Sequence, residues 1–332
     1  MKFLCVLLCL LCTTFCIKAQ NVLKFNQEGK FKIVQLTDVH NVYQDARSQV
    51  SLQRIREVLT SEKPDLVIIT GDVIYGKPAE EGFREVLSLI SDFKIPFGIT
   101  FGNHDDEQGM TRKQLLEIAS SYEYNLTSTA EGISGFSNYI LTVKSNDSAR
   151  DAAILYCMDS NSYSTIEGVK GYGFIKFDQI SWYRENSNKF TAANGGKPVQ
   201  SFAFFHIPLP EYSYAVEDQN AVMVGTRMEQ ACSPKLNSGM FAAMKENGDV
   251  KGIFVGHDHD NDYAVYWNNI LLAYGRYSGG NTVYNHLSNG ARVIELTENS
   301  GYFTTWITLE KGERINKVVC PDDFIKDKNK NM

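Results

Sequence analysis

The stretch from Leu66 to Tyr75 places the strongest constraint on how this chain can fold. Its first five residues, Leu66 to Thr70, are apolar or β-branched without alternation. Such a run is typical of a strand buried on both faces, as in a sheet covered by helices. Gly71 then permits a sharp turn, and Asp72 follows it directly. Because open α/β sheets bind ligands just beyond the carboxyl ends of their strands, we predict a central strand that delivers a carboxylate to a site.

Polar residues also follow the other predicted strands. Helical patterns over 48–61 and 79–93 alternate with strands over 31–37, 66–70 and 95–101, which predicts βαβ units with parallel strands. The carboxyl ends of parallel strands meet at one edge of a sheet, so the residues after them are brought together. With two further strands predicted over 200–205 and 251–255, the polar residues in this position are Asp38, His40, Asp72, Asn103, His104, His206, His257 and His259.

From Ile133 onward the pattern changes to short alternating runs. We expect further helices over 111–124, 178–187 and 236–245. A second sheet of antiparallel strands is expected over 138–143, 152–158 and 168–174, and hairpins over 263–309 with a glycine-rich turn at 275–281. The segment 210–233 has no clear period and is predicted to be a long loop beside the site. No linker rich in proline or glycine divides the chain, so we expect one domain.

Residues 1–19 are typical of a secretory signal peptide cleaved before Gln20, with Lys2 preceding an apolar run over 3–12. That run is too short to span a bilayer. A buried N-terminal strand is the alternative, but it does not explain four cysteines in the first sixteen residues. We therefore predict a secreted or periplasmic protein without a transmembrane segment, whose domain covers 20–315. A charged C-terminal tail over 316–332 is expected to be disordered or loosely attached.

The composition, with 43% hydrophobic and 22% charged residues, is that of a globular protein with a sizeable core. Removal of residues 1–19, which hold two lysines and no acid, changes the formal net charge from -6 to -8. This acidic balance argues against a nucleic-acid partner. Cys157, Cys232 and Cys320 remain, so at most one internal disulfide can form, and the sequence does not identify its members. Nothing in the sequence indicates the oligomeric state.

The distribution of histidine is the strongest chemical signal. Five of the six histidines lie at predicted strand ends beside Gly, Asp or Asn. Any one of them could be a hydrogen-bonded residue at a turn, but together they indicate a metal site. Nitrogen and oxygen ligands without cysteine suit Zn, Fe, Mn or mixed pairs. Two such ions about 3.5 to 4 Å apart can activate water and hold a phosphate, and we interpret Asp72 as the carboxylate that bridges them.

Five short motifs resemble the signature of the calcineurin-like metallophosphoesterases, in the order of that family. They are Asp38-x-His40, Gly71-Asp72, Gly102-Asn103-His104-Asp105, His206 and Gly256-His257-x-His259. The run from Gly256 to Tyr263 is similar to the single-domain subgroup named for purple acid phosphatase-like proteins of plants and fungi. The resemblance covers residues 31 to roughly 300. It implies an α/β fold, a four-layer α/β/β/α sandwich of two mixed sheets flanked by helices, with the site along one edge.

The resemblance also implies a role for each residue. It assigns one metal ion to Asp38, His40, Asp72 and His259, and a second to Asp72, Asn103, His206 and His257. His104 is then not a ligand but faces the substrate, where it donates a proton to the leaving oxygen or stabilises charge. Asp105 is expected to orient His104 or its loop, although its position also suits a helix cap.

The implied activity is hydrolysis of phosphate esters by a hydroxide that bridges two divalent or mixed-valence ions, either Fe, Zn or Mn. The partner is then a phosphate-ester small molecule or a phosphorylated substrate. The sequence does not choose between a phosphatase and a phosphodiesterase or nucleotidase. A non-catalytic, metal-binding secreted protein is the contrasting class, and the eight intact motif positions argue against it. Tyr75 has the spacing of an iron-binding tyrosine of purple acid phosphatases, but with His40 present we expect it to support or pack against the ligands.

Overall fold

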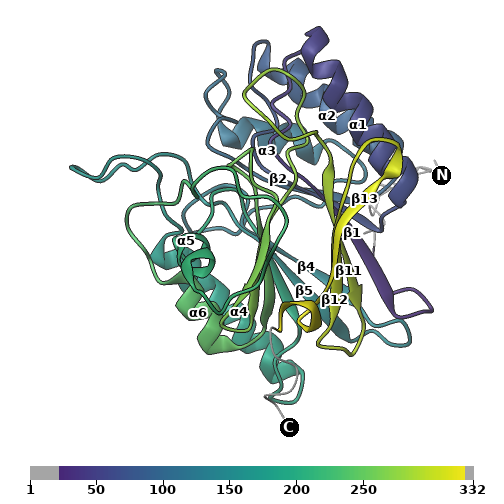
Figure 1. Cartoon of the computed structure of the whole chain (residues 1–332), viewed down its shortest axis with the longest axis vertical. Coiled ribbons are helices and arrows are strands. Elements are labelled where there is room, and N and C mark those ends of the chain that lie inside the picture. Colours follow the sequence, from purple (N-terminus) through teal and green to yellow (C-terminus); the bar gives the residue numbers. More distant parts are fainter. Residues whose placement is uncertain (1–21, 326–332) are drawn as a thin grey trace, which may run out of the picture.

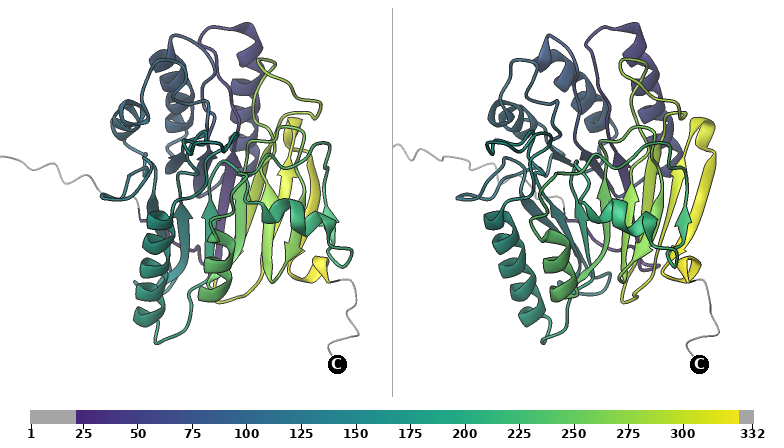
Figure 2. Two further views of the ribbon diagram at one scale, coloured as in Figure 1. Left: turned by 90° about the vertical axis from the view of Figure 1, so that its left-hand side faces the viewer. Right: turned by 60° about the vertical axis from the view of Figure 1, so that its left-hand side comes forward.

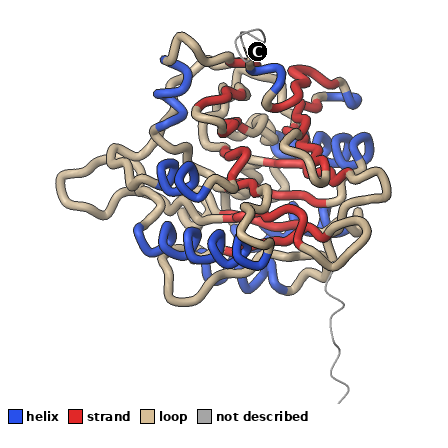
Figure 3. The backbone as a smooth tube through the Cα atoms, turned by 90° about the horizontal axis from the view of Figure 1, so that it is seen from below, coloured by secondary structure: helices blue, strands red, loops and turns tan. Residues whose placement is uncertain are grey.

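The computed structural model describes residues 22–325, so the predicted signal peptide lies outside the described residues. Two mixed sheets pack face to face, and helices cover the outer side of each (Figures 1 and 2). Three hydrophobic clusters fill the spaces between these layers: one under each set of helices and one between the sheets. Figure 3 shows the strands in the middle of the molecule and the helices outside them. The predicted α/β/β/α sandwich is confirmed.

The first sheet has six strands in the order β13-β12-β11-β1-β2-β3. Its parallel part contains the predicted βαβ units, with β1 (Lys30–Leu36), α1 (Ala46–Glu62), β2 (Leu66–Thr70), α2 (Ala79–Asp92) and β3 (Phe97–Thr100). The antiparallel part consists of β11 (Ala291–Thr297), β12 (Phe303–Thr308) and β13 (Arg314–Cys320). All five residues of β2 are fully buried, as their unbroken apolar run predicts. β2 is not central, however, because only β3 lies between it and the edge.

The second sheet has seven strands in the order β4-β5-β6-β8-β10-β9-β7. They are β4 (Tyr139–Lys144), β5 (Asp151–Cys157), β6 (Ser201–Phe204), β7 (Met223–Val224), β8 (Val250–Val255), β9 (Ala264–Trp267) and β10 (Ile270–Tyr274). Strands β4 and β5 pair antiparallel, as expected for 138–143 and 152–158. In the middle of the sheet β5, β6, β8 and β10 run parallel to one another. Helices α4 (Phe177–Ala193) and α6 (Met240–Asn247) lie in the crossovers and cover the outer face of this sheet. Its inner face packs against the first sheet.

Several segments between strands differ from prediction. Residues 168–174 form a loop with a single bridge, Tyr163 to Tyr172, because its glycines and tyrosines lack a sheet partner. The segment 210–233 contains α5 (Glu211–Glu217) and β7. The stretch 275–281 is not a hairpin turn but leads from β10 of the second sheet to β11 of the first. α3 (Arg112–Ser120) begins at a capping box in which Thr111 and Gln114 satisfy each other's backbone N–H groups.

The C-terminal strand extends the domain beyond the predicted end at residue 315. β13 runs to Cys320 in the first sheet, a short η1 turn (Glu310–Gly312) precedes it, and η2 (Asp322–Phe324) buries Phe324 between the sheets. Among the described residues the three cysteines are unpaired, with Cys157 and Cys320 buried. None of the helices in residues 22–325 combines the length and apolar character needed to cross a membrane.

Arg292 ties the two sheets together. Its side chain leaves β11 and is fully buried. The guanidinium donates hydrogen bonds to the backbone oxygens of Tyr274 (2.5 Å) and Asp262 (2.6 Å) and to the hydroxyl of Thr305 (3.0 Å). Because Tyr274 belongs to β10, these bonds fix the second sheet against the first close to the loop that follows β8.

Candidate metal centre

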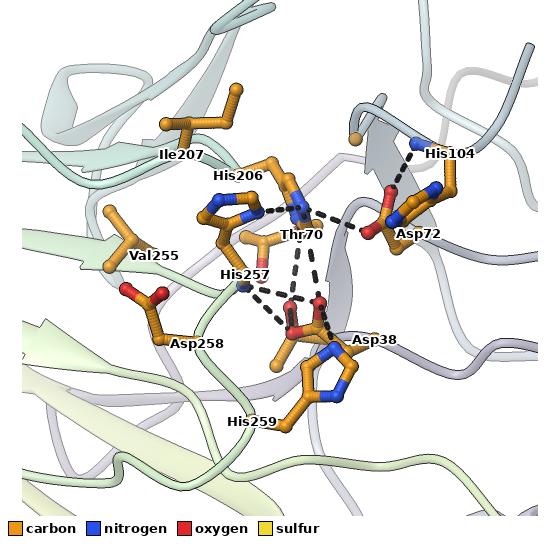
Figure 4. Close-up of polar contacts among 12 residues, drawn as sticks. Asp38, Thr70, Asp72, His104, His206, Ile207, Val255, His257, Asp258 and His259 are labelled. Atoms are coloured by element: carbon orange, nitrogen blue, oxygen red, sulfur yellow. Dashed lines mark hydrogen bonds and ion pairs between the residues drawn. The ribbon is translucent and has the colours of Figure 1, made fainter. Parts of the chain in front are cut away.

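The polar residues predicted from strand ends meet in one place. They come from loops that follow five strands belonging to both sheets, namely β1, β2, β3, β6 and β8. Figure 4 shows Asp38, Asp72, His206, His257 and His259 pointing toward one another, with His104 to one side. The residues Asp38, His40, Asp72, Asn103 and His206 are at most 1% exposed. The site is therefore a buried cluster of carboxylate, imidazole and amide groups.

Asp38, His40 and His259 form a first group whose ligand atoms all lie within 4.8 Å of one another. Nε2 of His40 is 3.1 Å from Nε2 of His259, and the latter is 3.6 Å from Oδ1 of Asp38. Two ligands of one ion, each about 2.1 Å from it at angles of roughly 90 to 110°, lie about 3.0 to 3.4 Å apart. The two imidazoles therefore have the separation that a shared ion requires.

Asp72, His206 and His257 form a second group of the same size. Nε2 of His206 lies 3.1 Å from Oδ2 of Asp72 and 3.3 Å from Nδ1 of His257. These distances again match ligands of a common ion. The imidazole of His206 is oriented by the backbone oxygen of Thr70, which accepts a hydrogen bond from Nδ1 of His206 at 2.7 Å. Hydrogen bonds of this kind orient metal-binding histidines.

Asp72 connects the two groups. Its Oδ2 faces His206 at 3.1 Å and Nε2 of His40 at 3.7 Å. Its Oδ1 is turned away and accepts a hydrogen bond from the backbone N–H of His104 at 2.8 Å. One oxygen is thus held by the backbone while the other faces both groups, which is the arrangement expected of a bridging carboxylate.

Asn103 supplies an oxygen donor beside the second group. Its side chain is fully buried, and its amide oxygen has no hydrogen-bond partner among the described residues. A buried amide oxygen without a partner is costly in free energy. A cation would remove that cost, so Asn103 fits the role of a ligand that its sequence motif implied.

The charges of the site also fit divalent cations. Within the described part of the chain, the only basic side chains within 4 Å of Asp38 and Asp72 are histidines. Burial alone raises the pKa of Asp38, but His206 and His259 outweigh it and lower that pKa to about 2. Burial lowers the pKa of His40 to about 3 and that of His257 to about 3. Burial also acts to lower the pKa of His206 and His259, but Asp72 and Asp38 outweigh it and raise the pKa of His206 to about 10, and Asp38 likewise raises that of His259. Metal binding at these two imidazoles would therefore release protons.

Four of these residues have left-handed backbone conformations. The φ angles are 53° at Asp38, 47° at His40, 53° at Asp72 and 80° at His257. Residues other than glycine rarely adopt such angles, and each instance costs of order 1–3 kcal/mol. Clustered strain of this kind is found where a binding site fixes side-chain directions, and here it turns the ligands inward at the strand ends.

Glycines let the strand-end loops approach one another. A Cβ on Gly102 would lie 2.1 Å from Oδ1 of Asp72, and a Cβ on Gly256 would lie 1.8 Å from Oγ1 of Thr37. No side chain can occupy either space. Glycine is therefore required at these motif positions because the loops that hold Asp38 and Asp72 pack too closely for a side chain.

Comparison with known proteins agrees with this geometry. The sequence model of calcineurin-like phosphoesterases matches residues 31–261. The chain belongs to this family. A protein of Arabidopsis thaliana described as "probable inactive purple acid phosphatase 29" is 32% identical over 285 residues, which cover 76% of this chain and 73% of that protein. Phosphatase DCR2 of Saccharomyces cerevisiae is 34% identical over 327 residues, covering 86% of this chain and 55% of that protein.

A solved structure shares the fold of this calcineurin-like phosphoesterase. A dimetal phosphatase from Danio rerio superposes with a TM-score of 0.59 over 87% of this chain and 98% of its own. The sequence identity is 13%. At that level the likeness concerns the arrangement of sheets and helices, and it supports no transfer of substrate.

His104 of this phosphoesterase lies beside the metal-binding groups and belongs to neither. Its ring centroid is 5.6 Å from that of His40, and its side chain is 27% exposed. Nδ1 lies 2.5 Å from Oε2 of Glu107. Nε2 is therefore the nitrogen that can reach a bound substrate. This position fits the predicted role of a group that acts on the substrate rather than on a metal ion.

Asp105 does not contact the imidazole of His104. Its buried carboxylate accepts hydrogen bonds from the backbone N–H groups of Gly102 (2.8 Å), Asp72 (3.0 Å) and Val73 (2.7 Å). Of the two roles expected for Asp105, orienting His104 and orienting the loop, the structure supports the second. The catalytic role predicted for Asp105 is corrected to a positioning role, because its fully buried carboxylate contacts the backbone around Asp72.

Three residues near the site are not evident from the motifs. Glu107 contacts His104, Tyr163 contacts Glu107 through its hydroxyl at 2.9 Å, and the Tyr172 ring lies edge-on to His257 at 4.3 Å. The only signal for Glu107 is its i, i+3 spacing from His104 in a polar turn. Tyr172 lies in the segment 168–174 predicted to be a strand, and Tyr163 lies in the loop before it, so their side-chain directions could not be foreseen. Tyr75 packs edge-on against His40 and His104, which agrees with a packing role.

Proposed function

We propose that this calcineurin-like phosphoesterase hydrolyses phosphate esters at a centre of two divalent or mixed-valence metal ions. The observation that carries the proposal is the position of Asp72 Oδ2 between two groups of ligands, within 3.7 Å of a histidine of each. Two ions bound there would supply a nucleophilic hydroxide and neutralise the phosphate oxygens. The identity of the ions is left to experiment, since the donor set suits Zn, Mn and Fe.

The residues of the site would have two kinds of role, metal binding and proton donation. Asp38, His40 and His259 would hold one ion and Asn103, His206 and His257 the other, with Asp72 touching both. Nε2 of His104 would donate a proton to the leaving oxygen as the bond from that oxygen to phosphorus breaks, and the hydroxide that the ions would supply would form the new bond to phosphorus. The released alcohol is then neutral.

The contrasting function is metal binding without catalysis, since the Arabidopsis relative is described as a "probable inactive" purple acid phosphatase. Intact ligand groups and the exposed edge of His104 favour catalysis. The test compares wild type with Asp72→Asn, both loaded with metal, on p-nitrophenyl phosphate and bis-p-nitrophenyl phosphate. We expect the variant to lose at least about 100-fold in turnover, on the scale of a lost catalytic ion. Equal turnover of the two proteins would refute the proposal.

We also propose that the chain is exported and that residues 1–19 are removed. N-terminal sequencing of protein recovered from the medium or periplasm should begin at Gln20. Recovery of the protein only inside cells, with Met1 retained, would contradict this.

A further inference from the structure

The carboxylate of Glu107 joins two side chains that the sequence does not connect. Its Oε2 lies 2.5 Å from Nδ1 of His104, and its Oε1 accepts a hydrogen bond from the hydroxyl of Tyr163 at 2.9 Å. Charge-assisted hydrogen bonds at this separation are stronger than those between neutral groups. Tyr163 therefore fixes one oxygen of the Glu107 carboxylate, and the other oxygen fixes the imidazole of His104.

The imidazole of His104 needs such a partner. At 27% exposure it is open to solvent on one side, and an imidazole without a fixed partner can rotate and exchange its two nitrogens. Donation from Nδ1 to Glu107 fixes the ring so that Nε2 remains for the substrate. The Tyr75 ring, edge-on to the imidazole with centroids 5.2 Å apart, also restricts its movement.

Tyr163 is itself fixed by the loop that carries it. Its ring stacks on Tyr172 at 5.6 Å, and hydrogen bonds from Ser164 N–H to Gly171 O and from Gly173 N–H to Ser162 O close the base of this loop. Tyr172 in turn lies against His257, a residue of the second ligand group. One loop thus braces both Glu107 and a predicted metal ligand.

We propose that Glu107 is a positioning residue that presents Nε2 of His104 to the leaving oxygen, and that Tyr163 holds Glu107 in place. The inference rests on the proposed phosphoesterase activity, because the leaving oxygen is where its effect is measured. Glu107 touches neither substrate nor metal ligands, so its substitution changes the behaviour of His104 and leaves the metal content unchanged.

The pairing is tested first without activity. In the metal-free protein, the Nδ1 proton of His104 should give a far-downfield proton NMR signal, assigned by its loss in His104→Ala. We expect the same signal to disappear in Glu107→Gln and to broaden through faster exchange in Tyr163→Phe. Tyr302→Phe is the matched control, since Tyr302 and Tyr163 are both 47% exposed. A signal unchanged in Glu107→Gln would overturn the pairing.

The consequence for catalysis is tested by a double-mutant cycle on the metal-loaded enzyme. We expect Glu107→Gln to lower kcat for an alkyl phosphate by roughly 10- to 100-fold and to have a smaller effect for p-nitrophenyl phosphate, which needs little protonation of its leaving group. In the His104→Ala background, Glu107→Gln should cause no further loss. Glu117→Gln, an exposed acid on α3, serves as the control for charge removal.

The outcomes separate the inference from the proposed function. Additive losses in the cycle, loss of an ion in Glu107→Gln, or an equal effect on both substrates would overturn the inference while the enzyme itself remained active. A wild-type protein that holds two ions and hydrolyses no ester would overturn the proposed function, and with it the catalytic purpose of the pairing. The expected result is a non-additive cycle with full metal content in every variant.

Discussion

The carboxylate of Asp105 accepts a hydrogen bond from the backbone N–H of Asp72 at 3.0 Å and so holds the loop on which the bridging position depends. Asp72 has a φ of 53°, an unfavourable backbone angle that this contact and those to Val73 and Gly102 keep in place. The geometry of the candidate metal centre is therefore built partly by a residue that belongs to neither group of ligands.

Asp105→Asn should weaken metal binding while leaving every ligand in place. The amide has one acceptor where the carboxylate has two, so at least one backbone N–H loses its partner. We expect metal affinity to fall by about 10- to 100-fold, the range seen when groups that orient ligands are removed. Titration with Zn or Mn measures this, with Asp92→Asn on the exposed end of α2 as the control. Unchanged affinity in Asp105→Asn would show that the loop holds its shape alone.

Prediction from sequence succeeded where the signal was local and periodic. The buried run of β2 and the polar residues after five strands were enough to bring Asp38, Asp72 and His206 to one edge. In the second sheet it found the antiparallel pair β4 and β5 but did not foresee the parallel pairing of β5, β6 and β8. These strands are buried on both faces, so their short apolar runs do not distinguish parallel from antiparallel pairing. Contacts such as Glu107 to Tyr163 lie 56 residues apart and depend on loop shape, which no local pattern encodes.

His104→Ala should keep both ions and lose turnover by roughly 100-fold or more, the scale of a positioned acid. His206→Ala should instead lose one ion, because Nε2 of His206 lies 3.1 Å from Asp72 and 3.3 Å from His257. Metal analysis of both proteins, together with their kcat values for alkyl and p-nitrophenyl phosphates, checks this. Loss of an ion in His104→Ala with retention of both in His206→Ala would show that the roles are assigned wrongly.

Gly102→Ala adds only one methyl group but should disrupt the candidate metal centre. The new methyl would lie 2.1 Å from Oδ1 of Asp72, so the Asp72 loop or the loop after β3 must move. We expect loss of metal binding together with a free energy of unfolding lower by about 1–3 kcal/mol, the cost of overpacking. Urea unfolding and metal titration measure these effects. Gly301→Ala, where a methyl meets nothing within 4 Å, is the control and should change neither.

Glu62 should make stability depend on pH far from the metal centre. It is buried at the end of α1 and accepts hydrogen bonds from Trp306, Thr308 and Arg314. Burial raises its pKa, but these donors outweigh burial and lower the pKa below 4.5. The carboxylate therefore stabilises the fold above the unfolded-state pKa, and this contribution is lost as the pH falls through the lowered folded-state value.

Glu62→Gln tests that dependence. The variant should be less stable than wild type at pH 7 by about 1–3 kcal/mol, the cost of weakening a buried hydrogen-bonded acceptor. The difference should shrink as the pH is lowered below 4.5, since wild-type Glu62 is then increasingly protonated. Urea unfolding across this pH range measures both stabilities. A difference that stayed constant with pH would mean that the charge of Glu62 contributes nothing.

The central claim is that one chain holds two metal ions through Asp72 and uses them to hydrolyse phosphate esters. Metal analysis and phosphatase assay of the same purified sample, reconstituted in turn with Zn, Mn and Fe, test it most directly. We predict about two ions per chain with at least one of these metals, together with turnover that disappears on chelation and returns on reloading. Fewer than about one ion per chain under all conditions, or two ions without hydrolysis of any monoester or diester, would contradict the account.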